Sequence, residues 1–173
     1  LISDYVKMDL TLLEKRHLPA YLAADGLCTI LLDKDGDVPQ PPAPSDRRYH
    51  LQKPSARSFD DCCNEFWNLG TYVTKGICRG ERLYAADLMQ LMRSELLRML
   101  AWQVGLRRGY TFSIGKNYKF LPQYLEDETR EALYSTYRMD SAEALWQALE
   151  TCQRLFRAAS GALAAALGYA YPP

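Results

Sequence analysis

One face of the segment 59–78 carries side chains that could bind a cationic ligand. Its polar residues recur at helical spacings of three and four: Asp61, Glu65, Asn68, Tyr72 and Lys75. Asn64 and Trp67 lie beside this row. Carboxylates accept strong hydrogen bonds from ammonium and guanidinium groups. The pattern therefore suits a cationic, hydroxyl-rich ligand, and an ordinary solvated helix face is the alternative.

A single carboxylate, Asp9, lies in the middle of an alternating segment. Residues 5–13 place Met8, Leu10 and Leu12 on one side and polar residues on the other, which predicts a half-buried strand. A carboxylate between apolar neighbours is costly unless it has a partner, a metal ion or open water. Asp9 is therefore a candidate metal ligand or general base, and a solvent-facing residue is the alternative.

A second group of candidates is basic. A glycine-led loop contains Gly115, Lys116, Asn117, Tyr118 and Lys119. Its lysines, backbone amides and the Asn117 side chain could hold phosphate oxygens. It is not a Walker A loop, because the upstream glycine and the Ser or Thr after the lysine are missing. A solvated loop is the alternative, and Lys75, Arg79 and Arg82 are further cations near one helix end.

The elements that must position these residues change in character along the chain. Strands are predicted over 5–13 and 27–32, with a short helix over 14–24 between them. Prolines gather in 36–57, which predicts an extended connection. Because two strands alone do not form a stable sheet, we expect them to complete a sheet whose other strands lie elsewhere.

Beyond this connection the pattern is helical. Apolar residues recur at three and four positions, which predicts helices over 59–78, 83–104 and 127–137 and a last one carrying Leu145 to Leu167. Asp140 and Glu143 resemble a capping box before that last helix. The predicted fold class is therefore α+β and mainly α.

Composition excludes several classes of protein. The 173 residues carry 21 basic and 21 acidic side chains, which gives no support for a nucleic-acid partner or a polybasic membrane surface. No apolar run approaches the roughly 18–20 residues of a membrane span. The five cysteines fit no zinc pattern, which favours reduced thiols in a cytoplasmic protein.

Four segments of the sequence resemble the bacterial aminoglycoside 6-adenylyltransferases, also called streptomycin adenylyltransferases. They are Phe59 to Trp67 (FDDCCNEFW), Met8 to Leu12 (MDLTL), Gly115 to Phe120 (GKNYKF) and Ser135 to Asp140 (STYRMD). The similarity extends over nearly the whole chain, from about residue 5 to about residue 172, and is that of a C-terminal fragment.

The resemblance implies a division into domains. Residues 1–38 are expected to be the C-terminal remnant, with its β-strands, of a nucleotidyltransferase domain. Residues 39–57 are the proline-rich connection, and residues 58–173 are expected to form a helical bundle, the substrate-binding domain.

The resemblance also implies a reaction. Family members transfer AMP from ATP to the 6-hydroxyl of streptomycin with Mg²⁺ as cofactor, which confers antibiotic resistance. Asp9 matches the position of a third catalytic carboxylate, which also binds the metal. The drug contacts are expected from Asp61, Asn64, Glu65, Trp67, Asn68 and Tyr72, and the ATP contacts from Lys75, Arg79, Lys116, Asn117 and Lys119.

The sequence departs from the family at its beginning. Family members carry a Gly-Ser turn and an Asp-x-Asp pair before the third aspartate, and only eight residues precede Asp9. A missing N-terminal nucleotidyltransferase segment is therefore expected, and this chain alone is expected to be inactive. The alternative function is a non-catalytic helical module that binds a ligand or partner.

Overall fold

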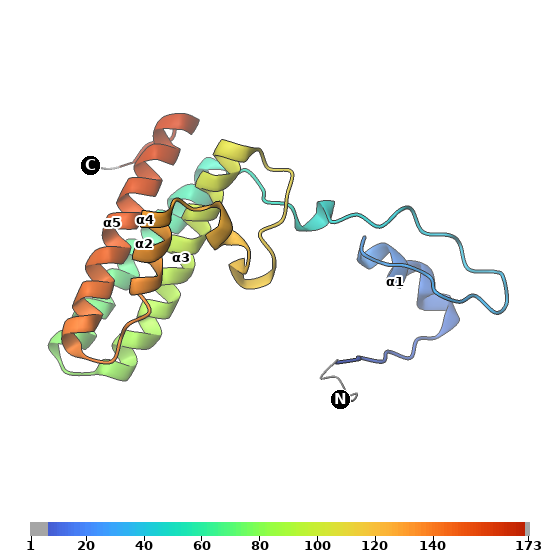
Figure 1. The fold of residues 1–173 in the computed structure, drawn as a ribbon, viewed down its shortest axis with the longest axis horizontal. Helices are drawn as coiled ribbons and strands as arrows, with labels where there is room; N and C mark the ends of the chain where they lie inside the picture. The colour runs from blue at the N-terminus through green and yellow to red at the C-terminus, as the bar shows by residue number, and fades with distance from the viewer. Residues whose placement is uncertain (1–6, 172–173) are drawn as a thin grey trace. The chain divides into compact units, whose positions relative to one another are not determined.

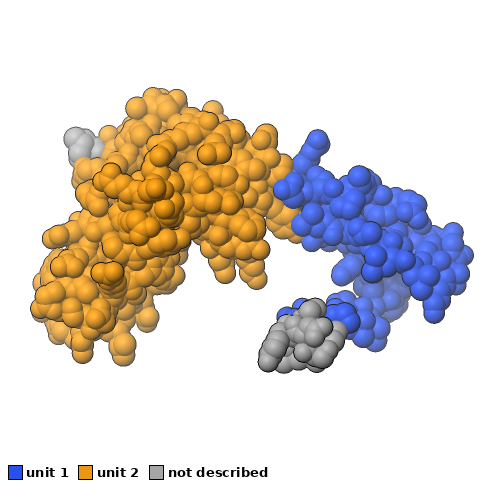
Figure 2. Space-filling view, viewed as in Figure 1, with its two compact units in different colours: residues 1–48 blue, residues 49–173 orange. Residues whose placement is uncertain are grey.

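The computed structural model describes residues 7–171. The chain divides into two compact units, Leu1–Arg48 and Tyr49–Pro173, which Figure 2 shows in different colours. We call them unit 1 and unit 2 and describe each by itself. Among residues 7–171, none of the helices has the length and apolar composition that crossing a membrane requires.

Unit 2 is a bundle of helices. Helices α2 and α3 pack against each other, both contact α5, and α4 packs on α5 (Figure 1). Short 3₁₀ turns, η3 (Lys116–Tyr118) and η4 (Leu121–Tyr124), lie between α3 and α4. The bounds of the helices are α2 Ala56–Cys78, α3 Arg82–Arg108, α4 Asp127–Ser135 and α5 Ala142–Leu167.

Local sequence explains where the long helices begin and end. The Ser55 hydroxyl accepts a hydrogen bond from the Ser58 amide at 3.1 Å, which caps the start of α2. The start of α5 is capped by Ser141, which accepts from the Ala144 amide at 3.0 Å, so the predicted cap at Asp140 was one residue early. Gly168 ends α5 with a φ of 70°, a conformation that glycine adopts without strain.

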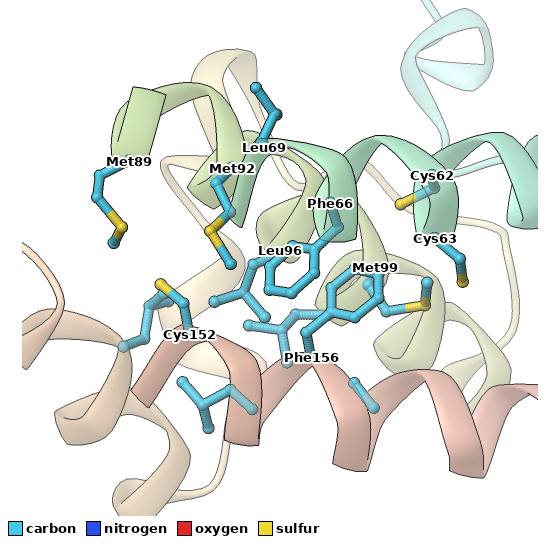
Figure 3. Close-up of a cluster of buried hydrophobic side chains, with 14 of the residues drawn as sticks. Cys62, Cys63, Phe66, Leu69, Met89, Met92, Leu96, Met99, Cys152 and Phe156 are labelled. Carbon is cyan, nitrogen blue, oxygen red and sulfur yellow. The ribbon is translucent and has the colours of Figure 1, made fainter. Parts of the chain in front are cut away.

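The core of the bundle is built on two phenylalanine rings. Phe66 of α2 and Phe156 of α5 are both fully buried and stack with centroids 3.7 Å apart and ring planes 6° from parallel. Figure 3 shows the two rings face to face, with methionine and leucine side chains of α3 around them. The predicted apolar positions of α2 are all buried, which confirms the helical interpretation: Phe59, Cys62, Phe66, Leu69, Val73 and Ile77.

A fully buried arginine ties α3 to the end of α4. Arg93 donates from Nε to the Thr136 hydroxyl at 3.0 Å and from a terminal nitrogen to the Gln90 side chain at 2.8 Å. Its other terminal nitrogen donates to the Thr136 carbonyl. The Tyr137 ring lies 4.0 Å from the guanidinium carbon. Burial lowers the pKa of Arg93, and these neutral acceptors replace the water that the group has lost.

Unit 1 contains α1 (Leu18–Ala24), which follows the 3₁₀ turn η1 (Lys15–His17). Within residues 7–171 no segment is a β-strand, so the predicted remnant strands over 5–13 and 27–32 are wrong, while the mainly α prediction is right. Residues 5 and 6 lie outside the described residues. Met8, Leu10 and Leu12 are 72%, 87% and 89% exposed. Alternation supplies an apolar face, but a strand also needs a neighbour for its backbone hydrogen bonds.

The buried thiols should resist alkylation in the folded protein. All five cysteines are free, and burial raises the pKa of Cys63 to about 12 and that of Cys152 to about 11. Burial also raises the pKa of Cys62. Because the thiolate is the reactive form, iodoacetamide at about pH 8 should label the exposed Cys78 first and leave these thiols unmodified. Peptide mass spectrometry checks this, and rapid labelling of Cys152 would contradict the packing.

Candidate functional site

Four polar residues of α2 open into a hollow beside α3. The hollow has a volume of about 470 Å³. The α2 residues lie at spacings of three and four along the helix, so they share one face. We call this hollow the acidic pocket; its lining residues are Asp61, Asn64, Glu65 and Asn68 from α2 and Glu95 and Arg98 from α3.

The acidic pocket is negatively charged. Asp61, Glu65 and Glu95 contribute carboxylates, and Arg98 contributes the one guanidinium of the lining. Asp61 also lies 3.7 Å from the Arg57 side chain, but exposed pairs of this kind are weak because water screens them. A hollow lined by one sign of charge attracts ligands of the other sign. Its carboxylates and carboxamides can therefore bind ammonium, guanidinium and hydroxyl groups.

Two of the predicted drug contacts lie outside this pocket. The Trp67 ring packs edge-on against Phe66, with centroids 5.2 Å apart, and the Arg157 guanidinium carbon lies 5.0 Å from the Trp67 centroid. The Trp67 side chain therefore packs where α2 meets α5. Tyr72 lies farther along α2, where its ring centroid is 4.9 Å from the Lys75 ammonium nitrogen. The roles of Trp67 and Tyr72 in binding stay predictions.

The predicted ATP contacts fall into two groups. Asn117 and Lys119 line a second hollow of about 370 Å³, together with tyrosines of the same loop and of the α4 end. Lys116 belongs to the same segment, 115–120, which we call the basic loop. Lys75 and Arg79 lie instead at the C-terminal end of α2.

The basic loop has an unusual backbone. Asn117 and Tyr118 have positive φ values of 55° and 60°, and such left-handed conformations are uncommon outside glycine. The preceding Gly115 has a φ of 73°, and a Cβ there would lie 2.7 Å from Cγ of Lys119. This backbone holds the Tyr118 side chain partly buried near Arg98, whose charge opposes the rise in the Tyr118 pKa that burial causes.

Comparison with known proteins identifies the family. A family model described as Streptomycin adenylyltransferase matches residues 1–173. The chain belongs to the streptomycin adenylyltransferase family. The resemblance inferred from the sequence motifs is thereby confirmed.

Curated relatives agree with the streptomycin adenylyltransferase family. Proteins named aminoglycoside 6-adenylyltransferase are 52% identical in Campylobacter jejuni and 47% identical in Bacillus subtilis (strain 168), each over 99% of this chain. The chain spans 60% and 61% of the length of these two relatives and matches their C-terminal part. A crystal structure of an aminoglycoside 6-adenyltransferase from Bacillus subtilis has 43% identity and a TM-score of 0.67, covering 91% of this chain and 58% of that one.

Asp9, the predicted catalytic and metal-binding residue, belongs to unit 1. Its carboxylate is exposed and lies 2.8 Å from the Lys7 ammonium group. Within residues 7–171 no group of three or more Asp, Glu, His or Cys side chains is arranged to hold a metal ion. The catalytic and metal-binding roles of Asp9 therefore stay predictions.

Sequence reasoning missed Glu95 and Arg98. A signal for Glu95 was present, because it lies three residues after Met92 and four before Met99 and therefore falls within the apolar stripe of α3. A carboxylate in an apolar stripe requires a partner or an opening to solvent. The structure supplies both, in the form of Arg98 and the acidic pocket.

Proposed function

We propose that this chain is the drug-binding part of an enzyme that transfers AMP from ATP to the 6-hydroxyl of streptomycin and so confers antibiotic resistance. Its membership of the streptomycin adenylyltransferase family and the names of its relatives support this proposal. The observation that carries it is the acidic pocket, whose charge complements a polycationic drug.

The drug contacts are divided by chemistry. Asp61 and Glu65 accept hydrogen bonds from the guanidinium groups of streptomycin, and such charge-assisted bonds are the strong ones. Asn64 and Asn68 each offer a donor and an acceptor, which suits sugar hydroxyls. Tyr72 extends this surface farther along α2, and Trp67, at the junction with α5, is the remaining proposed contact.

The ATP contacts are proposed on the basic loop. Lys116 and Lys119 bind triphosphate oxygens and Asn117 donates to them, with Lys75 and Arg79 as further cations. Positioning and charge neutralisation account for most of the catalysis in phosphoryl-type transfer, so cations of this kind suit the task. Because ATP is the co-substrate, we place the reaction in the cytoplasm.

Asp9 is proposed to act on the attacking hydroxyl. Its carboxylate accepts the proton of the 6-hydroxyl while that oxygen bonds to the α-phosphorus of ATP, and pyrophosphate leaves. A carboxylate near the reacting hydroxyl is a suitable general base. Asp9 would also offer an oxygen ligand to Mg²⁺, which prefers such hard donors.

Binding of streptomycin to the 173-residue chain tests the proposal directly. Isothermal titration calorimetry should detect binding at about 50 mM salt that weakens steeply toward about 500 mM salt, because the attraction is between charges. An uncharged sugar such as sucrose should give no heat of binding. Streptomycin binding that is absent, or that does not respond to salt, would contradict the assignment of the acidic pocket.

A further inference from the structure

The carboxylate of Glu95 is buried and poorly satisfied. The residue is only 9% exposed, and its Oε2 atom lies 2.9 Å from a terminal nitrogen of Arg98. That oxygen is nevertheless without a well-aligned hydrogen bond within the described residues. A buried carboxylate held by charge attraction without an aligned donor retains part of its desolvation cost.

Glu95 opens into the acidic pocket, where a ligand could supply the missing donor. The Glu95 carboxylate lines the same pocket as Asp61 and Glu65 of α2. A guanidinium or ammonium group entering there could point an N–H bond at Glu95 with the alignment that Arg98 lacks.

The Arg98 side chain is much more exposed than the carboxylate with which it pairs. Its side chain is 47% exposed, whereas that of Glu95 is 11% exposed, so a turn of Arg98 uncovers little of the core. Its second neighbour is the phenol of Tyr118 in the basic loop. A long side chain of this kind can give up Glu95 and keep Tyr118 while its charge stays near solvent.

We propose that Arg98 is a displaceable counter-ion. It pairs with the Glu95 carboxylate in the free protein, and a cationic group of the aminoglycoside takes its place in the complex. This inference rests on the proposed function and adds Glu95 as a third carboxylate that binds the drug. Arg98 displaced from Glu95 keeps the Tyr118 phenol, with which it already interacts, as a polar partner. A ligand must compete with Arg98 for Glu95, which selects for well-aligned cationic groups over simple monovalent ions.

Substitution of Arg98 gives the deciding test. Arg98→Gln removes the competing cation and should tighten streptomycin binding to the 173-residue chain about 3- to 10-fold, within the range of one charge-assisted hydrogen bond. The Arg98→Lys variant retains a cation at this position, so its affinity for streptomycin should equal that of the wild type. Arg154→Gln, which removes an exposed charge on α5, is the matched control and should change the affinity less than about 2-fold.

The Glu95→Gln variant should change the streptomycin affinity in the opposite direction. It should weaken streptomycin binding about 10-fold, because the third carboxylate is lost. Thermal unfolding supplies a second measurement: ligand-free Arg98→Gln should melt below the wild type, since Glu95 loses its cation, and saturating streptomycin should raise its melting temperature more than it raises that of the wild type. If Glu95→Gln fails to fold, the Arg98 series decides alone.

The outcomes separate this inference from the proposed function. If Glu65→Gln weakens streptomycin binding but Arg98→Gln tightens it no more than Arg154→Gln does, the counter-ion role is wrong and the pocket assignment stands. Weaker binding by Arg98→Gln would make Arg98 a direct or structural contact and would also overturn the inference. If the wild type does not bind streptomycin, or Glu65→Gln and Glu95→Gln leave its binding unchanged, the proposed function fails and this inference fails with it.

Discussion

Replacing Glu65 with lysine is expected to lower the affinity of this chain for streptomycin about 100-fold, or roughly 2.7 kcal/mol. Glu65 is exposed in the acidic pocket, so a lysine there places a cation where the drug must place its own. The fold should tolerate the change, because Asp61 lies one turn before Glu65 and a lysine removes their like-charge repulsion.

The Glu65 experiment uses calorimetry with a matched control. Glu150→Lys makes the same change of charge at an exposed position of α5 and should alter the affinity less than about 3-fold through long-range effects. Glu65→Gln should give an intermediate loss of about 10-fold, with a smaller effect on ATP binding. Equal losses for Glu65→Lys and Glu150→Lys, or for both ligands, would show that Glu65 does not contact the drug.

Replacing Phe156 with alanine is expected to lower the free energy of unfolding by about 3–5 kcal/mol. The ring is fully buried and stacks on Phe66 at 3.7 Å (Figure 3). Its loss removes apolar burial and leaves a cavity where α2 and α5 meet, so both the transfer and the packing contributions are lost. Urea unfolding followed by circular dichroism measures the change.

A graded variant shows whether the stacked rings carry the effect. Phe156→Leu retains much of the volume and should cost about 1.5 kcal/mol or less. The streptomycin affinity of folded Phe156→Leu should stay within about 2-fold of the wild type, because Phe156 does not line the acidic pocket. A loss below about 1 kcal/mol for Phe156→Ala would mean that the ring is not packed as the structure has it.

The helices of unit 2 could be predicted because their information is local. The spacing of Phe59, Phe66 and Val73 in α2 is the spacing of one helix face, and all three are buried. The N-terminal cap of α5 was harder to predict, because Asp140 and Ser141 are both good capping residues. Only the structure shows that Ser141 accepts the hydrogen bond.

The strands could not be predicted in the same way. Alternation at Met8, Leu10 and Leu12 indicates only that a segment could cover a core, whereas strand formation depends on a partner far away in sequence. Within residues 7–171 the backbone of this segment finds no such partner, and its apolar side chains are exposed. A pattern that requires a distant neighbour is therefore weaker evidence than one that is satisfied within its own helix.

The same contrast holds for the acidic pocket. Asp61, Asn64, Glu65 and Asn68 could be grouped from sequence because they share one face of one helix. The sequence marks Glu95 as a carboxylate in an apolar stripe, but it does not say which turn of α3 faces that side of α2, so neither Glu95 nor Arg98 could be assigned to the pocket. Trp67 was grouped with them from its neighbouring position, but its side chain lies at the junction with α5.

The buried Arg93 makes the attachment of α4 cooperative. Before α4 docks, water solvates the Arg93 guanidinium on α3. After α4 has docked, the guanidinium donates hydrogen bonds to the Thr136 hydroxyl and carbonyl oxygens instead. A half-docked α4 would strip water from this charge without returning those hydrogen bonds, and such a state is strongly disfavoured. The segment that follows the basic loop is therefore expected to be either fully seated or fully released, with few molecules in between.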